Sequence, residues 1–218
     1  FIANIVGGVM EDYAQIASEV ATMCPDMVEV NISCPNVEDE LGKPMACSIS
    51  KSAEVTRLVK DRLREAGGGK IPVVVKLSPN VENIVSIAAS VLDAGADGIT
   101  AINSVGPGMA IDIDFARPIL ANKVGGLTGP AIKPLAVKYV YDIYKAHKCP
   151  IIGTGGVTTG RDAIEMMMAG AGLIGVGSAV WLHGPEVFEK IVKEMNAWCD
   201  ENGVKEIQSL IGKAHGNN

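Results

Sequence analysis

The stretch IPVVVKLSPN, residues 71–80, decides the fold class of this sequence. Its near-continuous apolar run is typical of a parallel strand that other elements cover on both faces. The run ends abruptly at Lys76 and Leu77, which a serine, a proline and an asparagine follow. An apolar strand that turns polar at its carboxyl end is typical of parallel sheets that carry their chemistry at that edge.

The same unit recurs along the chain. Short apolar runs alternate with amphipathic stretches, which indicates six successive βα units and an α/β fold with a parallel sheet. We expect strands over residues 1–6, 27–33, 72–77, 97–102, 150–154 and 173–177. We expect helices over about 9–22, 51–66, 81–94, 130–147, 160–169 and 185–200.

Two architectures are compatible with this order of elements. A doubly wound sheet needs a glycine-rich phosphate loop after its first strand, and Gly7-Gly8 is too short for that. A TIM (β/α)8 barrel instead places functional residues at the carboxyl ends of several strands. Such residues finish almost every strand here: Asn31 and Cys34, Lys76, Asn103 and Ser104, Gly155 and Gly156, Gly177 and Ser178. The pattern therefore favours a barrel, of which this chain holds about six βα units.

The first residues already have the character of a core strand, because Phe1 opens an apolar run without a preceding methionine. We therefore expect further residues upstream, amounting to two more βα units. No charge-rich or low-complexity linker interrupts the pattern, so residues 1–218 are expected to form one barrel domain that is incomplete at its N-terminus.

The composition narrows the function classes. The 218 residues are 48% hydrophobic and 20% charged, which is ordinary for a globular chain with one sizeable core. A net charge of -6 disfavours nucleic acid or an anionic membrane as the main partner. The five cysteines are scattered and form no CxxC pair, so we expect reduced thiols in the cytoplasm and no metal site.

Cys34 stands out among the cysteines. In VEVNISCPNV, residues 28–37, a buried-strand pattern ends in a thiol that lies between the amides of Asn31 and Asn36. A plain turn does not need a thiol at this position. A thiol poised near ambient pH can act as a base, and flanking amides can orient a substrate without adding charge.

The last two units indicate a phosphate site. PIIGTGGVTTGRDA, residues 150–163, places Gly155-Gly156 before a helix that Thr158 or Thr159 can cap, and LIGVGSAV repeats the design with Gly177-Ser178. Backbone N–H groups at glycine turns and helix N-termini bind phosphate, and barrels favour the loops after the last two strands for this purpose. The glycine-rich stretch 125–134 adds a further flexible approach.

Six motifs together resemble a known family. NISCPNV, VVVKLSPNV, GITAINS, GGLTGPAIKP, PIIGTGG and GVGSA look like the successive motifs of class 1 dihydroorotate dehydrogenase, in particular the 1B form of many bacteria and archaea. The resemblance runs in order from the first residue to about residue 180. It implies an FMN-containing barrel that oxidises dihydroorotate to orotate in pyrimidine synthesis.

The resemblance also implies roles for single residues. Cys34 matches the base that removes the C5 proton while C6 gives hydride to flavin N5. Asn31, Asn36, Asn103 and Ser104 match groups that hold the pyrimidine ring. Lys76 matches the lysine beside flavin N1 and O2, where a cation stabilises the anionic reduced ring. Gly129, Gly155, Gly156, Gly177 and Ser178 match flavin and phosphate contacts.

The resemblance also implies partners for this chain, and Cys47 departs from the class 1B pattern. The resemblance to class 1B implies a homodimer that works with an electron-transfer subunit carrying FAD and an iron–sulfur cluster. Cys47, thirteen residues after Cys34, has no usual counterpart in class 1B. The related dihydropyrimidine dehydrogenase uses a thiol there for proton transfer, but it has histidine where this chain has Asn36. An alternative is therefore a uracil or thymine reductase that uses Cys47. A flavin-free phosphate-binding isomerase or aldolase, and a non-catalytic barrel, also stay open.

Overall fold

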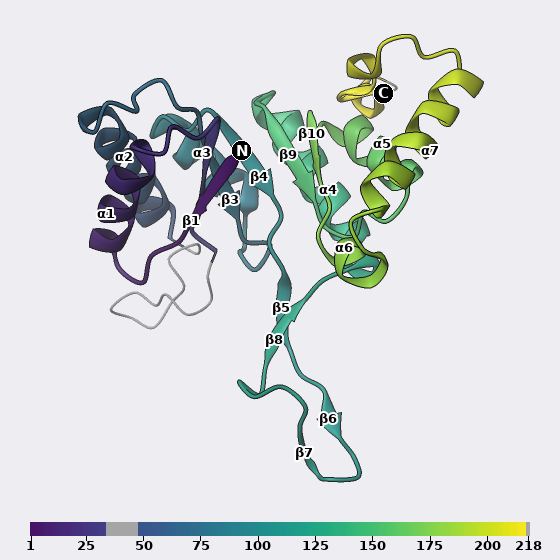
Figure 1. Cartoon of the computed structure of the whole chain (residues 1–218), viewed down its shortest axis with the longest axis horizontal. Helices are drawn as coiled ribbons and strands as arrows, with labels where there is room; N and C mark the ends of the chain where they lie inside the picture. The colour runs from purple at the N-terminus through teal and green to yellow at the C-terminus, as the bar shows by residue number, and fades with distance from the viewer. Residues whose placement is uncertain (34–47, 217–218) are drawn as a thin grey trace.

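A six-stranded parallel sheet organises the computed structural model of the chain, which describes residues 1–33 and 48–216. Its strands follow the order β1 (Ile2–Ile5), β2 (Met27–Asn31), β3 (Val73–Leu77), β4 (Gly98–Ala101), β9 (Ile151–Thr154) and β10 (Leu173–Gly175). Every neighbouring pair is parallel. The sheet curls, with helices along its outer face, as part of a (β/α)8 barrel does (Figure 1). The prediction of six βα units in a partial barrel is confirmed.

The helices follow the strands in alternation. They are α1 (Met10–Ala21), α2 (Ile49–Glu65), α3 (Ile84–Asp93), α4 (Lys133–His147), α5 (Gly160–Ala169), α6 (Ser178–His183) and α7 (Val187–Glu201). Short 3-10 turns form at η2 (Pro130–Ile132), η3 (Ile207–Leu210) and η4 (Lys213–His215). No helix in the described part of the chain is both long and apolar enough to span a bilayer.

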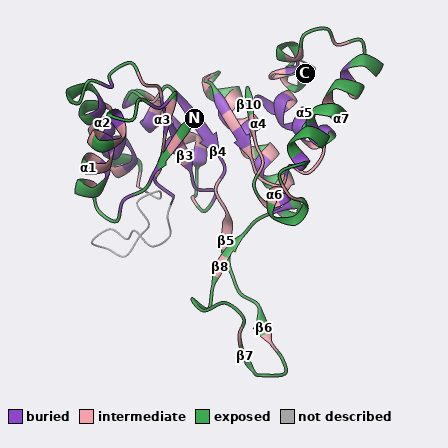
Figure 2. Cartoon of the chain, viewed as in Figure 1, coloured by how far each residue is buried: buried purple, intermediate pink, exposed green. Residues whose placement is uncertain are grey.

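The core lies between the sheet and the helices that cover it (Figure 2). In β2, Val28 and Val30 are fully buried, whereas the alternating residues Glu29 and Asn31 are only partly covered. Because successive side chains of a strand point to opposite faces, the valines pack toward the helices and the polar pair lies on the opposite, concave face. In β3 all three valines are buried, which agrees with the continuous apolar run in the sequence.

Two helix starts differ from the predictions. The helix expected over 81–94 begins at Ile84, since the side chain of Asn83 accepts a hydrogen bond from the N–H of Ser86 at 3.1 Å. The helix expected over 130–147 divides into η2 and α4, with Pro130 in the first turn. Helix α6 has no counterpart among the helices expected from the sequence.

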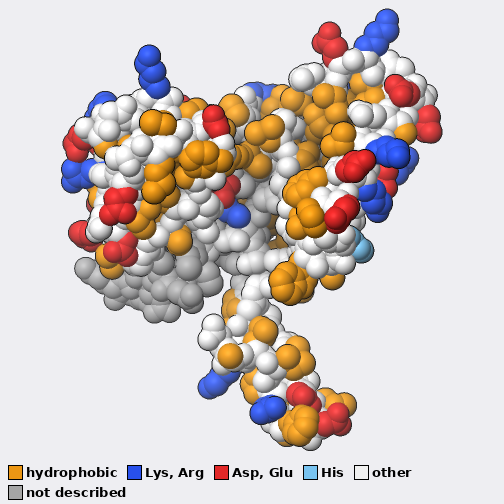
Figure 3. Space-filling model, viewed as in Figure 1, with side chains coloured by type: hydrophobic (Ala, Val, Ile, Leu, Met, Phe, Trp, Pro, Cys, Tyr) orange, Lys and Arg blue, Asp and Glu red, His pale blue; other side chains and the backbone are white. Residues whose placement is uncertain are grey.

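A slender arm over residues 105–127 is the largest feature that the sequence analysis did not predict. It contains β5 (Val105–Gly108) paired antiparallel with β8 (Gly125–Leu127), and β6 (Ile111–Asp112) paired with β7 (Arg117–Pro118). The arm extends away from the sheet (Figure 1) and carries hydrophobic side chains on its surface (Figure 3). Ile113 is 87% exposed and Phe115 is 69% exposed. Of the stretch 125–134, expected as a flexible approach, residues 125–127 form β8 in this arm, and the rest contains η2 and the start of α4.

Candidate active site

The carboxyl ends of the parallel strands bring the predicted site residues to one edge of the sheet. Asn31 is the last residue of β2 and pairs in register with Lys76 of β3, which in turn pairs with Thr100 of β4. Asn103 follows β4 and donates its backbone N–H to the carbonyl of Leu77 at 2.9 Å. The strand ends are thus held side by side, as a barrel mouth requires.

Asn31, Ser33, Lys76 and Asn103 form what we call the amide cluster. The Oδ1 of Asn31 accepts hydrogen bonds from the N–H of Ser33 at 3.1 Å and from its hydroxyl at 2.7 Å. The Nδ2 of Asn103 donates to the Ser33 hydroxyl at 2.7 Å. Ser33 is buried and joins two amides that lie 72 residues apart in the sequence. The Nδ2 of Asn31 makes no hydrogen bond with the described residues, so it is available to a ligand.

Lys76 supplies the charge of the amide cluster. Its ammonium lies 3.8 Å from the Oε1 of Glu29, and its side chain is 24% exposed. At this distance the two groups form an ion pair, but they are too far apart for a hydrogen bond. Within residues 1–33 and 48–216 the ammonium has no hydrogen-bond acceptor, although it carries three N–H donors. A partly covered cation with free donors is suited to an anionic or carbonyl-rich ligand.

Ser104 lies at the border between the amide cluster and the arm. The Nδ2 of Asn80 donates to the carbonyl of Ser104 at 3.3 Å, and the Oδ1 of Asn80 accepts from the N–H of Gly106 at 3.0 Å. A Cβ on Gly126 would lie 2.1 Å from the hydroxyl of Ser104, so the second strand of the arm passes directly over this serine. Ser104 is therefore fixed by the root of the arm.

Three predicted residues, Cys34, Asn36 and Cys47, lie outside the described residues. In the sequence, Ser33 is the last described residue before Cys34, and Ser48 is the first described residue after Cys47. Their placement stays a prediction.

The second group of predicted residues, which we call the glycine cluster, consists of Gly129, Gly155, Gly156, Gly177 and Ser178. A Cβ on Gly156 would lie 2.7 Å from the carbonyl oxygen of Gly129, and one on Gly129 would lie 3.8 Å from the Cβ of Ser178. The turns after β8, β9 and β10 therefore adjoin one another. Gly156 has a φ of 77°, a conformation that favours glycine.

The N–H groups of the glycine cluster and those of α5 differ in availability. Thr159 caps α5 as predicted, because its hydroxyl accepts from the N–H of Asp162 at 3.2 Å. The carboxylate of Asp162 accepts from the N–H groups of Thr158 and Thr159, at 3.0 and 2.9 Å. The N–H of Gly160 donates to Glu194 at 2.6 Å. The start of α5 is thus satisfied internally, and it does not offer these N–H groups to a phosphate.

The N–H groups of Gly156 and Gly177, by contrast, make no hydrogen bond with the described residues. No described atom outside its neighbours would lie within 4 Å of a Cβ on Gly177, so this turn is open. Free N–H groups on adjoining glycine turns are what an anion requires. The phosphate-binding capacity therefore lies in the glycine cluster itself.

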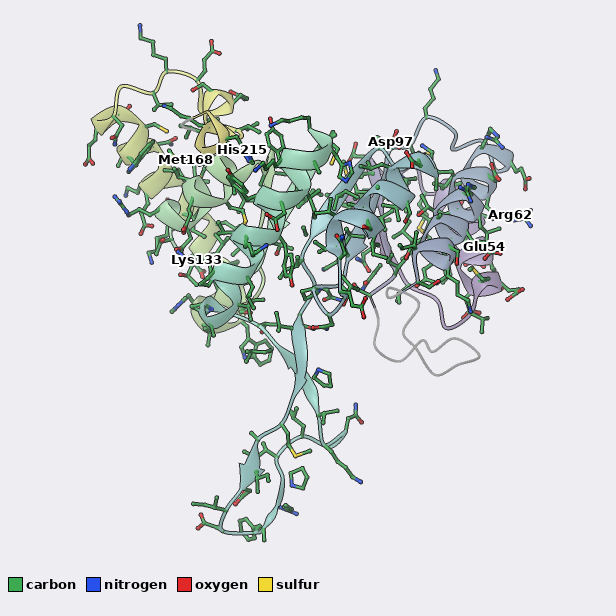
Figure 4. All side chains as sticks on the ribbon, turned by 180° about the vertical axis from the view of Figure 1, so that it is seen from behind. Glu54, Arg62, Asp97, Lys133, Met168 and His215 are labelled. Carbon is green, nitrogen blue, oxygen red and sulfur yellow. The ribbon has the colours of Figure 1, made fainter. Side chains whose placement is uncertain are left out.

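An ion-pair network between α4 and α5 adjoins the glycine cluster. The ammonium of Lys133, the first residue of α4, lies 2.7 Å from Asp162 and 2.6 Å from Glu165 on α5. Lys133 lies at the end of α4 that faces the arm (Figure 4). A Cβ on Gly156 would also lie 2.8 Å from the Cβ of Lys133. The ion pairs therefore join the two helix starts on either side of the Gly156 turn.

These contacts shift the ionisation of the network. Burial opposes ionisation of Asp162, but hydrogen bonds from Lys133, Thr158 and Thr159 outweigh burial and hold the pKa of Asp162 well below its ordinary value. The hydrogen bond to Asp162, followed by that to Glu165, raises the pKa of Lys133. Asp162 and Lys133 therefore stay charged over the physiological range of pH.

Comparison with known proteins decides the family. The family described as dihydroorotate dehydrogenase matches residues 1–198. The chain is 44% identical over 214 residues to the catalytic subunit of dihydroorotate dehydrogenase B (NAD(+)) from Methanothermobacter thermautotrophicus, covering 98% of this chain and 68% of that relative. The chain belongs to the dihydroorotate dehydrogenase family.

Other members of the family give the same result. The corresponding catalytic subunit of Methanocaldococcus jannaschii is 42% identical over 98% of this chain, and that of Geobacter sp. strain M21 is 42% identical over 97%. The chain spans about two thirds of the length of these relatives. The resemblance noted in the sequence is thereby confirmed. Dihydroorotate dehydrogenases are flavin-dependent oxidoreductases with a TIM-barrel fold, and the curled sheet of this chain fits that fold.

The structure adds residues that the sequence analysis did not select. Ser33 joins Asn31 to Asn103, Glu29 faces Lys76, and Lys133 with Asp162 supports the Gly156 turn. The period of β2 could have indicated Glu29, because a carboxylate two residues before Asn31 must share its face. The pairing of Lys133 with Asp162 had no local signal, since the two residues lie 29 positions apart.

Proposed function

We propose that this chain catalyses the FMN-dependent oxidation of dihydroorotate to orotate in de novo pyrimidine biosynthesis. The observation that carries the proposal is the partly covered ammonium of Lys76, which has no hydrogen-bond acceptor among the described residues and lies at the strand ends with Asn31 and Asn103. A cation with free donors beside amide groups suits a site for a carbonyl-rich ring. The family relationship gives the reaction class.

The described residues fit FMN at both of its ends. Lys76 would face the N1 and O2 side of the ring, and the N–H groups of Gly156 and Gly177 would bind the phosphate. Gly129, Gly155 and Ser178 complete that phosphate site, because the turns that carry them adjoin. The flavin, when bound, supplies the acceptor for the hydride that leaves C6 of the substrate, at its N5.

The remaining assignments concern the substrate and the proton. Asn31, Asn36, Asn103 and Ser104 hold the pyrimidine ring, and the free Nδ2 of Asn31 supports its part in this. Cys34 in its thiolate form takes the C5 proton and becomes a thiol, while the C5–C6 bond of the substrate becomes a double bond. The anchoring of Ser33, the residue before Cys34, by both amides supports placing this step beside Asn31.

We further propose that residues 1–218 belong to a single flavin-binding domain that acts in the cytoplasm within a larger assembly. The relatives are named as catalytic subunits of NAD(+)-linked enzymes. This supports a second subunit that carries FAD and an iron–sulfur cluster and passes electrons to NAD. The exposed apolar side chains of the arm offer surface for a homodimer (Figure 3).

A second candidate activity is reduction of uracil or thymine, as in dihydropyrimidine dehydrogenase. Cys47 is the observation that favours it, since that enzyme uses a thiol there for proton transfer. Asn36 opposes it, because that enzyme has histidine at this position.

Anaerobic mixing of the FMN-loaded protein with each substrate tests the proposal. We expect dihydroorotate to bleach the flavin absorbance and dihydrouracil to leave it unchanged. Bleaching by dihydrouracil alone would establish the second activity instead. A protein that neither retains nor takes up FMN would exclude both flavin reactions and favour a flavin-free barrel enzyme.

A further inference from the structure

Glu29 is a carboxylate to which the proposed reaction gives no role. It lies on β2 two residues before Asn31, so both side chains lie on the concave face of the sheet. Only 13% of its side chain is exposed. Burial of a carboxylate is unfavourable unless partners compensate its charge, so the partners of Glu29 define what it does.

Three other strands of the sheet, β1, β3 and β4, contribute to its surroundings. The Nδ2 of Asn4 on β1 donates to the Oε1 of Glu29, and the hydroxyl of Thr100 on β4 donates to its Oε2 at 2.6 Å. The ammonium of Lys76 on β3 lies 3.8 Å from Oε1. Two neutral groups therefore hold the carboxylate by hydrogen bonds. Lys76, the only cation beside it among the described residues, forms an ion pair with it but no hydrogen bond.

This arrangement separates position from charge. Because Asn4 and Thr100 hold Glu29, the carboxylate stays in place when Lys76 moves. The ammonium of Lys76 keeps all its donors for a ligand and has Glu29 as its counter-charge when that ligand is neutral. A ring that gains negative charge competes with Glu29 for the same ammonium.

We propose that Glu29 is a positioning residue that acts through Lys76 and lowers the reduction potential of the bound flavin. The inference rests on the proposed function. While Glu29 is charged, it offsets part of the stabilisation that Lys76 gives to the reduced ring. Without the charge of Glu29, the ammonium of Lys76 interacts with the flavin ring alone, and the reduced form becomes more stable.

The experiment compares the two-electron midpoint potential of FMN in the full-length wild-type enzyme with that in Glu29→Gln. We expect the potential to rise in the variant by the equivalent of a tenfold or larger change in the oxidised-to-reduced equilibrium, about 30 mV. Thr100→Val is the matched control, because it removes a hydrogen bond to the same carboxylate and leaves the charge. Its potential is expected to stay within twofold of wild type, about 9 mV.

Each other outcome overturns the inference. A potential in Glu29→Gln within twofold of wild type would show that the carboxylate does not act on the flavin. A lower potential would show that Glu29 only holds Lys76 in place. If Glu29→Gln does not fold, Glu29→Asp replaces it, with a smaller rise expected because the carboxylate is withdrawn by one methylene. Failure of the wild-type enzyme to bind FMN would overturn the proposed function itself. A wild-type potential in Glu29→Gln would overturn only the role of Glu29.

Discussion

The amide cluster and the glycine cluster lie at the same edge of one sheet but are built differently. The amide cluster consists of side chains on and after β2, β3 and β4, and side-chain hydrogen bonds through Ser33 hold it together. The glycine cluster offers backbone N–H groups, and its shape depends on the positive φ of Gly156 and on the close approach of Gly129. One region is defined by its functional groups and the other by its conformation.

This difference predicts two kinds of sensitivity. A substitution in or beside the amide cluster changes the chemistry and leaves the backbone in place. A substitution in the glycine cluster changes the backbone, so it alters cofactor binding before it alters any reacting group.

The largest effect is expected beside the amide cluster, in Cys34→Ser. A serine hydroxyl is far less acidic than a thiol and is a poor base at neutral pH. We expect flavin binding close to that of wild type and a rate of flavin reduction by dihydroorotate about 100- to 10,000-fold lower. Anaerobic single-turnover stopped-flow kinetics measures this rate.

Cys47→Ala is the matched control for Cys34→Ser, since it removes the other thiol that the resemblance makes a candidate base. We expect little change in the rate of flavin reduction. A large loss in Cys47→Ala together with near-normal reduction in Cys34→Ser would assign the base to Cys47.

In the glycine cluster, Gly156→Ala should weaken FMN binding. A left-handed backbone costs a residue with a Cβ about 1–2 kcal/mol, and here the Cβ would also lie 2.7 Å from the carbonyl of Gly129. We expect a loss of about tenfold or more in FMN affinity, since about 1.4 kcal/mol corresponds to a factor of ten. In the protein molecules that retain FMN, dihydroorotate should reduce the flavin at the wild-type rate.

Gly203→Ala is the control for backbone strain. Gly203 also has a positive φ, 64°, but no described atom outside its neighbours would lie within 4 Å of its Cβ. We expect Gly203→Ala to lose about 1–2 kcal/mol of stability, the cost of a left-handed backbone, and to keep the wild-type FMN affinity. Thermal unfolding and fluorescence titration measure these two quantities. Equal FMN affinities for the two variants would show that Gly156 does not shape the phosphate site.

A smaller effect is expected from Lys133→Met, which removes the cation behind the glycine cluster. Asp162 keeps its hydrogen bonds to Thr158 and Thr159 but loses its ion pair to α4. We expect FMN affinity to fall several-fold and the free energy of unfolding to fall by about 1–3 kcal/mol. Lys138→Met, one turn further along α4, breaks the more exposed pair with Asp142 and should leave FMN affinity unchanged. Equal losses in both variants would indicate a general effect of charge on α4.

The sequence predicted the scaffold well because each strand carries its own signal. Val73, Val74 and Val75 indicated a covered strand, and the structure places all three in the core. Because the strands are parallel, the positions of Asn31 and Lys76 at one edge followed from their places at the strand ends, and the register confirms it.

Features that depend on tertiary contacts could not be predicted in this way. In residues 105–127 the only strand-like alternation is the short run Ile111–Phe115, and the paired segments β5 and β8 consist largely of glycine, so the pairing of β5 with β8 had no local signal. Ser33 is indistinguishable from a turn residue until Asn103 is brought to it from another strand. The side chain of Asp162 also appears as an ordinary residue of the first helical turn, and only the fold brings Lys133 to it.

The smallest effect we predict concerns the acid dependence of Asp162, which tests whether the glycine cluster has a charged support. Because the pKa of Asp162 is lowered in the folded state from an ordinary value of 3.8, its ionised form stabilises the fold above that value. This stabilisation is lost as the pH falls toward the folded-state pKa, since only the unfolded chain takes up the proton. The difference in unfolding free energy between wild type and Asp162→Asn should therefore be constant above about pH 5 and shrink by about 1 kcal/mol between about pH 5 and pH 3. Urea unfolding at a series of pH values measures this difference. A difference that does not change with pH down to about pH 3 would show that Asp162 is not paired in the folded protein, and the support would then have to come from the glycine turns alone.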